Sequence, residues 1–314
     1  MKVLVTGAAG FIGMHCAERL LARGDQVAGL DNLSPYYSVQ LKKDRLARLK
    51  HEDFHFSQVD IADAEALEKV FTKEKPQAVL HLAAQAGVRY SLDNPRAYIE
   101  TNLVGFANLL ECCRRHPPRQ LVFASSSSVY GANTQLPWSE SQNVDRPVSL
   151  YAATKKSNEL LAHVYHHLYG LPATGLRYFT VYGPWGRPDM SPMLFAEAIA
   201  KGKPIQVFNH GDMARDFTYI DDIVEGTLRV LDRPAGYAVY NIGNHQPVLL
   251  LDYIAALERA FGREAKLDMK PMQPGDVKAT YADTSALRAA VGFAPSTPLD
   301  VGLARFAEWF KSYY

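Results

Sequence analysis

Short apolar runs alternate with longer amphipathic stretches through the first 180 residues of the chain. Runs typical of buried strands occupy residues 2–5, 27–30, 54–59, 78–83, 121–124 and 174–179. Between them, apolar residues recur at helical spacing over 11–22, 41–49, 64–71, 98–113 and 151–169. Such alternation is typical of βαβ units, whose right-handed crossovers produce a parallel sheet. We therefore predict a doubly wound, Rossmann-like α/β fold.

The pattern changes after about residue 180, where Pro and Gly become frequent. This change predicts loops and short helices in a smaller α/β domain. Residues 217–224 and 238–243 are apolar enough to return to the first sheet. We predict a dinucleotide-binding domain over 1–179 with returning segments near 213–243, and a substrate-binding domain over 180–212 and 244–314.

Composition excludes several classes of protein. The formal net charge is only +1, which offers no basis for electrostatic binding of nucleic acid. No apolar run approaches the roughly 20 residues of a membrane span. The odd count of 3 cysteines and a start without signal-peptide features favour a reducing cytoplasm over a disulfide framework. Without CxxC or clustered His/Cys spacing, we expect no metal site.

A glycine-rich turn follows the first predicted strand. Gly7, Gly10 and Gly13 lie between this strand and the first predicted helix, where glycines let backbone N–H groups approach a pyrophosphate. Asp31 ends the next predicted strand. A carboxylate at that position accepts hydrogen bonds from a ribose 2′-OH and repels a 2′-phosphate. The pattern therefore favours NAD over NADP.

A tyrosine, a lysine and a run of serines provide the groups needed for hydride chemistry on an alcohol. Tyr151 and Lys155 share one face of a predicted helix, and Ser126 and Ser128 follow the end of a predicted strand. Lowering a tyrosine pKa from about 10 to neutrality requires about 4 kcal/mol. One cation about 4 Å away supplies that much at an effective dielectric of about 20, and Lys155 and the oxidised nicotinamide are two candidates. We expect Tyr151 to act as the base and a serine to hydrogen-bond the substrate oxygen.

These motifs, in this order, resemble the extended short-chain dehydrogenase/reductase family, which includes nucleotide-sugar epimerases and dehydratases. The resemblance covers essentially the whole chain. It implies that NAD is bound tightly and recycled. It also implies a set of cofactor-binding residues, namely Gly7, Gly10, Phe11, Ile12, Gly13, Asp31, Asn32, Lys43, Asp60, Ile61, Leu82, Ala83, Ala84, Asn102, Tyr151, Lys155 and Tyr178.

Several longer segments, among them AAQAGVRYSLDNP (83–95) and RYFTVYGPWGRPDM (177–190), are similar to bacterial UDP-glucuronate 4-epimerases. This resemblance implies oxidation of UDP-glucuronate at C4, rotation of the 4-keto sugar and reduction on its opposite face, giving UDP-galacturonate. It also implies a homodimer formed through the helices over 98–113 and 151–169. The implied substrate-binding residues are Arg89, Ser127, Ser128, Thr180, Arg187, Gln206, Phe208, Arg215 and Asp276.

Other reactions remain open at this point. UDP-glucuronate decarboxylases and dTDP-glucose dehydratases resemble this chain but have an acidic residue in the segment that here reads Ser126–Ser128. The absence of a carboxylate there favours epimerisation. A 4-epimerase of neutral sugars such as UDP-glucose or UDP-N-acetylglucosamine is the nearest alternative, and it predicts that Arg187→Ala barely changes activity. An NAD-binding sensor without turnover is a further alternative, disfavoured because both Tyr151 and Lys155 are present.

Overall fold

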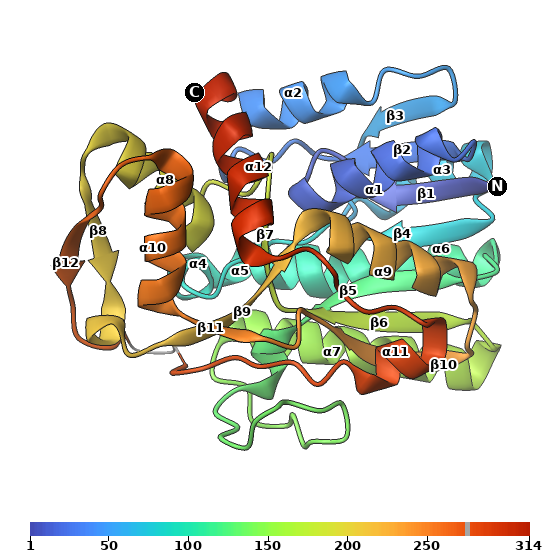
Figure 1. Cartoon of the computed structure of the whole chain (residues 1–314). Coiled ribbons are helices and arrows are strands. Elements are labelled where there is room, and N and C mark those ends of the chain that lie inside the picture. The colour runs from blue at the N-terminus through green and yellow to red at the C-terminus, as the bar shows by residue number, and fades with distance from the viewer. Residues whose placement is uncertain (274–276) are drawn as a thin grey trace.

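The computed structural model describes residues 1–273 and 277–314. Seven parallel strands form the central sheet in the order β10-β6-β5-β4-β1-β2-β3 (Figure 1). This order, with the chain winding outward in both directions from β1, confirms the predicted doubly wound sheet. The strands are β1 (Lys2–Thr6), β2 (Gln26–Asp31), β3 (Phe54–Gln58), β4 (Ala78–His81), β5 (Leu121–Ser126), β6 (Ala173–Tyr178) and β10 (Tyr237–Ile242).

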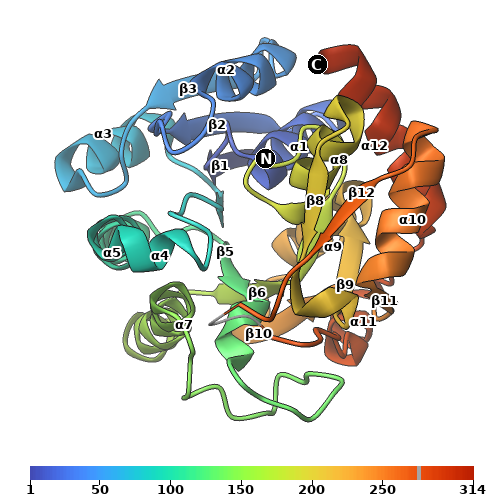
Figure 2. The same cartoon turned by 90° about the vertical axis from the view of Figure 1, so that its left-hand side faces the viewer.

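Helices cover both faces of this sheet (Figure 2). One face packs against α1 (Phe11–Ala22) and α9 (Ile220–Asp232), and the other against α3 (Ala64–Glu74), α6 (Phe106–Arg115) and α7 (Leu150–Tyr169). Central strand residues such as Val79 and Leu80 are fully buried because side chains alternate between the two covered faces. Burial on both faces explains why these strands appear in the sequence as continuous apolar runs.

The helix predicted over 98–113 is divided into three parts. These are α5 (Pro95–Tyr98), a π-helical turn η1 (Ile99–Gly105) and α6. Within the turn, the backbone oxygen of Asn102 accepts a hydrogen bond of 2.6 Å from the Asn158 side chain of α7. π turns inside helices occur mostly at functional sites, and this one lies beside the pocket described below.

The prediction that residues 217–224 return to the central sheet is wrong. β9 (Ala214–Tyr219) instead belongs to a separate three-stranded sheet, and α9 begins directly after it at Ile220. Asp221 and Asp222 occupy the first turn of α9, where carboxylates are favoured by the helix dipole. The segment that does return is β10, which pairs in parallel with β6.

The remaining elements lie mainly beyond the carboxyl ends of the central strands (Figure 1). Two small sheets have the orders β11-β9-β7 and β12-β8. No helix among the described residues is long and apolar enough to cross a membrane. The other elements are α2 (Val39–Arg48), α4 (Tyr90–Asp93), η2 (Ser127–Tyr130), β7 (Thr180–Tyr182), α8 (Ser191–Lys201), β8 (Pro204–Val207), η3 (Phe208–Gly211), β11 (Pro247–Leu249), α10 (Leu250–Phe261), β12 (Lys266–Met269), α11 (Ser285–Val291) and α12 (Leu299–Tyr313).

Candidate active site

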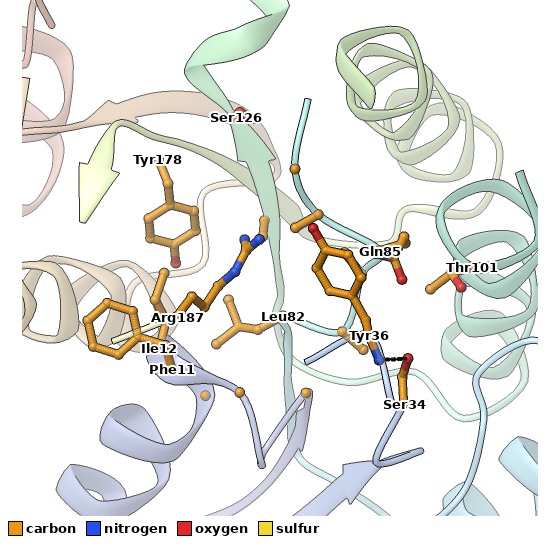
Figure 3. Close-up of a pocket in the computed structure, with 18 of the residues that line it drawn as sticks. Phe11, Ile12, Ser34, Tyr36, Leu82, Gln85, Thr101, Ser126, Tyr178 and Arg187 are labelled. Carbon is orange, nitrogen blue, oxygen red and sulfur yellow. Dashed lines mark hydrogen bonds between the residues drawn. The ribbon is translucent and has the colours of Figure 1, made fainter. Parts of the chain in front are cut away.

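A cavity of about 520 Å³ opens at the carboxyl ends of β1, β2, β4, β5 and β6, where doubly wound sheets bind their ligands (Figure 3). It brings together residues that lie far apart in the sequence. The predicted site residues that line it are Gly7, Gly10, Phe11, Ile12, Gly13, Asp31, Asn32, Asp60, Ile61, Leu82, Ala83, Ala84, Ser126, Ser127, Ser128, Tyr151, Lys155, Tyr178, Thr180 and Arg187.

The glycine turn forms one wall and tolerates no side chain at two of its glycines. Gly7 has a φ of +73°, and a Cβ there would lie 2.7 Å from the backbone nitrogen of Ala83. A Cβ on Gly13 would lie 2.1 Å from the Gly7 carbonyl oxygen. Helix α1 starts immediately after Gly10, which caps it without a side-chain hydrogen bond. The bare backbone and the positive end of the helix suit a diphosphate.

Asp31 ends β2 beside this turn. Its carboxylate accepts hydrogen bonds from the backbone N–H of Ala9 (3.1 Å) and of Leu33 (2.8 Å). Burial raises the pKa of Asp31, whereas the Lys42 ammonium and these N–H donors act in the opposite direction. Nearby, Asn32 donates a hydrogen bond of 2.9 Å to Asp60. These groups fit the ribose of a dinucleotide better than a 2′-phosphate, since Asp31 would repel the phosphate.

Tyr151 and Lys155 enter the cavity from the first turns of α7, which Ser149 caps with a hydrogen bond of 3.1 Å to the backbone N–H of Ala152. Burial raises the pKa of Tyr151, while a hydrogen bond with Ser126 and the charge of Arg187 oppose the rise. Lys155 donates a hydrogen bond of 2.8 Å to the Ala124 carbonyl, and burial lowers its pKa to about 8. The charge of Arg187 thus favours the phenolate of Tyr151 in this structure, and the predicted roles of Lys155 and the oxidised nicotinamide stay predictions.

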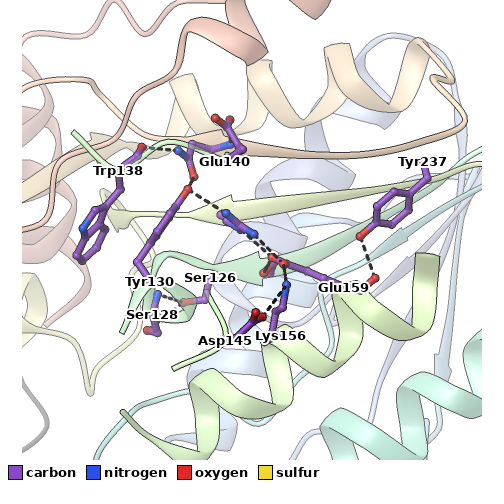
Figure 4. Close-up of polar contacts among 12 residues, drawn as sticks. Ser126, Ser128, Tyr130, Trp138, Glu140, Asp145, Lys156, Glu159 and Tyr237 are labelled. Atoms are coloured by element: carbon purple, nitrogen blue, oxygen red, sulfur yellow. Dashed lines mark hydrogen bonds and ion pairs between the residues drawn. The ribbon is translucent and has the colours of Figure 1, made fainter. Parts of the chain in front are cut away.

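The serine run turns sharply at the end of β5. The Ser126 hydroxyl accepts a hydrogen bond of 3.1 Å from the backbone N–H of Ser128 and donates one of 3.1 Å to the Ser128 hydroxyl. These contacts hold the two predicted catalytic serines together at the cavity wall (Figure 4).

Ser125 also lines the cavity, but its hydroxyl belongs to a buried polar network behind the site. Its hydroxyl donates a hydrogen bond of 2.6 Å to Glu159, which also forms a buried ion pair of 2.8 Å with Arg177 (Figure 4). Arg177 in turn donates a hydrogen bond of 3.0 Å to the hydroxyl of Tyr130. The network ties β5, β6 and α7 together and thereby fixes the strand end that carries Ser126.

Other predicted residues do not line this cavity. Lys43 is exposed on α2, because the helical turn of about 100° per residue directs its neighbour Lys42 inward instead. Asn102 is buried behind the wall, where its side-chain amide pairs with both backbone groups of Gln85 at 2.9 Å. These two residues had been expected to contact the cofactor.

Four of the remaining predicted substrate-binding residues lie away from this cavity. The Arg89 guanidinium stacks 5.1 Å from the centre of the Phe208 ring. Gln206 is exposed on β8, and Arg215 on β9 donates a hydrogen bond of 2.9 Å to the Ala214 carbonyl. None of these four lines the cavity. Asp276 lies outside the described residues.

Several residues of the cavity and its rim were not predicted. Lys42, Tyr36 and Gln85 line the wall, and Figure 3 labels the last two. Asp189 contacts Arg187. Tyr36 and Asp189 are 153 residues apart in the chain, so no local motif connects them. The only signal for Lys42 is helical phase, which places it on the buried face of α2 together with Arg45.

Comparisons with known proteins extend this picture. Residues 3–243 match the NAD dependent epimerase/dehydratase family. The chain is 51% identical to Protein CapI of Staphylococcus aureus, covering 100% of this chain and 99% of that protein. It is 46% identical to a probable UDP-glucuronate 4-epimerase of Rhizobium meliloti, covering 100% of this chain and 98% of that protein. The crystal structure of UDP-glucuronic acid 4-epimerase from Bacillus cereus, in complex with UDP-glucuronic acid and NAD, superposes with a TM-score of 0.94 at 36% identity, covering 100% of both chains.

Proposed function

Because this chain belongs to the NAD dependent epimerase/dehydratase family, we propose that it interconverts UDP-glucuronate and UDP-galacturonate by NAD-dependent epimerisation at C4. One observation supports this most strongly. The guanidinium of Arg187 lines the same cavity as the phenol of Tyr151 and the hydroxyls of Ser126 and Thr180. An arginine suits a substrate that has a carboxylate next to the reacting carbon.

The proposed chemistry assigns each step to a residue of the cavity wall. Tyr151, as the phenolate, removes the proton of the C4 hydroxyl, and Ser126 hydrogen-bonds the same oxygen. NAD bound along the glycine turn and Asp31 would supply the acceptor and the donor of the hydride at C4. After the 4-keto sugar has rotated so that its opposite face lies toward the cofactor site, Tyr151 returns the proton to the C4 oxygen. Lys155 is buried beneath this wall, whereas Tyr151 is half-buried with its side chain at the cavity.

The serine run supports epimerisation over elimination or decarboxylation. Ser126, Ser127 and Ser128 line the cavity. The resemblance to dehydratases and decarboxylases implies an acid in this segment of those enzymes. Hydroxyls at this point can hold a carboxylate by hydrogen bonds, but they do not remove a C5 proton at neutral pH. Thr180 and Arg187 complete the proposed carboxylate site, while Arg89, Gln206, Phe208, Arg215 and Asp276 remain the proposed contacts of the UDP group.

We also propose that the protein is a cytoplasmic homodimer. Ile99 and Val104 on η1, and Leu160, Val164 and Leu168 on α7, are between 40% and 60% exposed. The three α7 residues recur every fourth position, so they form one apolar stripe. A second copy of the same pair of helices would cover it. The three cysteines are free, as is typical of a reducing compartment.

A proton NMR time course of the purified protein with UDP-glucuronate, and with no added NAD, tests the proposed reaction. We expect signals of UDP-galacturonate, with the small H3–H4 and H4–H5 couplings of an axial 4-hydroxyl. Signals of a UDP-pentose would show decarboxylation instead. An unchanged spectrum, together with turnover of UDP-glucose or UDP-N-acetylglucosamine, would identify an epimerase of neutral sugars.

A further inference from the structure

One edge of the Arg187 guanidinium is occupied by a residue of its own loop. Asp189 accepts hydrogen bonds from Nε (3.1 Å) and from Nη2 (2.5 Å) in the segment between β7 and α8. A guanidinium has five N–H donors, and this contact uses the Nε edge. Among the hydrogen bonds of the described residues, none involves Nη1 of Arg187, and its side chain lines the cavity (Figure 3).

Asp189 is itself held by a residue from the cofactor side of the cavity. The Tyr36 hydroxyl, from the segment between β2 and α2, donates a hydrogen bond of 3.0 Å to Asp189 Oδ2. Burial and the Asp189 carboxylate raise the pKa of Tyr36, so this phenol remains a donor at physiological pH. Gly87 leaves the room for this contact, because a Cβ there would lie 3.1 Å from the Tyr36 hydroxyl oxygen.

The backbone before Arg187 is held as well. The buried Arg45 side chain donates hydrogen bonds to the carbonyl oxygens of Trp185 (2.7 Å) and Gly186 (3.0 Å). The same guanidinium donates to the carbonyl of Ala9 in the glycine turn at 3.1 Å. Both the backbone leading to Arg187 and the carboxylate beside its guanidinium are therefore fixed to the dinucleotide-binding half of the cavity.

We propose that Asp189 is a specificity-determining positioning residue, which holds the Nε edge of Arg187 so that its Nη1 edge faces the carboxylate of a uronic acid substrate. This inference rests on the proposed function. The Arg187–Asp189 pair has no net charge, so selectivity for the carboxylate depends on two directed N–H donors more than on an excess positive charge. Without Asp189, the long side chain of Arg187 would occupy several rotamers and lose that direction.

Dissociation constants for UDP-glucuronate and UDP-glucose, measured by calorimetry, test this inference. All variants also contain Tyr151→Phe, which prevents turnover. No NAD is added beyond the NAD that each variant retains after purification. We expect Asp189→Ala to weaken UDP-glucuronate binding at least tenfold while changing UDP-glucose binding less than twofold. Tyr36→Phe should weaken UDP-glucuronate binding about threefold. The matched control is Asp300→Ala, which removes an exposed carboxylate paired with Arg259 and should change neither constant.

Two results would overturn the inference. Tighter binding of UDP-glucuronate by Asp189→Ala would show that Asp189 competes with the substrate for Arg187. Equal weakening of both ligands, or an unchanged ratio of the two constants, would show a general structural role. The proposed function fails separately, if the protein with Tyr151 intact does not convert UDP-glucuronate.

Discussion

Desolvation at the cavity wall raises the pKa of Tyr151, although the proposed reaction needs its phenolate. Of the groups near it in the described structure, the Ser126 hydroxyl and the Arg187 guanidinium favour the charged form. Arg187 therefore has two proposed roles, because the guanidinium that donates hydrogen bonds to the substrate carboxylate also stabilises the phenolate. The Lys155 ammonium donates a hydrogen bond to the Ala124 carbonyl, which fixes its position beside the end of β5.

Arg187→Met should move the acid limb of the pH profile of kcat/KM to higher pH. Removing the cation disfavours the phenolate and raises the pKa of Tyr151. At a fixed pH below that pKa, the reactive fraction falls about tenfold for each unit. We expect a shift of about one unit, measured with saturating NAD between pH 6 and 9. Arg187→Lys keeps the charge and serves as the control. A higher KM, with the acid limb of the kcat/KM profile at the same pH as in the wild type, would show that Arg187 acts only on the substrate.

Contacts between distant loops limit what can be inferred for single residues. The glycine turn, Asp31, Tyr151 and Lys155 are recognisable because each belongs to a short motif at a strand end or helix start, and all of them line the cavity. Asp189 and Tyr36 belong to no such motif, since their contact depends on how two irregular segments fold against each other. For this reason the sequence analysis does not include Asp189 and Tyr36 among the predicted site residues.

Among elements, α1 was predicted over 11–22 and is found as Phe11–Ala22. Its boundary is clear in the sequence because glycines precede a strongly periodic apolar pattern. Residues 217–224 were misassigned because a strand end and a helix start are both apolar there, and Asp221–Asp222 marks the helix start. The π turn at Ile99–Gly105 has no signature in the periodicity, since it depends on the side-chain contact from α7.

The apolar stripe of α7 provides a test of assembly. Leu160→Glu places a charge in the middle of the stripe, and a buried unpaired charge destabilises an interface strongly. We expect the wild type to sediment as a dimer and Leu160→Glu mainly as a monomer, by analytical ultracentrifugation at micromolar concentration. Leu249→Glu on β11 is the matched control, because Leu160 and Leu249 are both 56% exposed. A Leu160→Glu variant that stays dimeric would place the interface elsewhere.

The doubly wound sheet places predicted cofactor-binding and catalytic residues at the same edge, where the carboxyl ends of its strands lie. The ends of β1 and β2 provide the glycine turn and Asp31. The end of β5 provides the serine run, the end of β6 provides Tyr178, and the start of β7 provides Thr180. The fold class was predictable because alternation of strands and helices is a property of the whole first half of the chain. The division into one domain over 1–179 with returning segments near 213–243, and another over 180–212 and 244–314, stays a prediction; β10, which lies in the returning part, pairs with β6.

In the proposed reaction the C4 hydrogen leaves and returns within one binding event, and a substrate labelled at C4 shows whether it does. UDP-glucuronate with deuterium at C4 is converted in ordinary water without added NAD, and the product is analysed by mass spectrometry and NMR. We predict that UDP-galacturonate keeps the deuterium at C4 and all of its carbon atoms. Loss of the label to solvent, or a product that lacks the carboxylate, would contradict the proposed reaction.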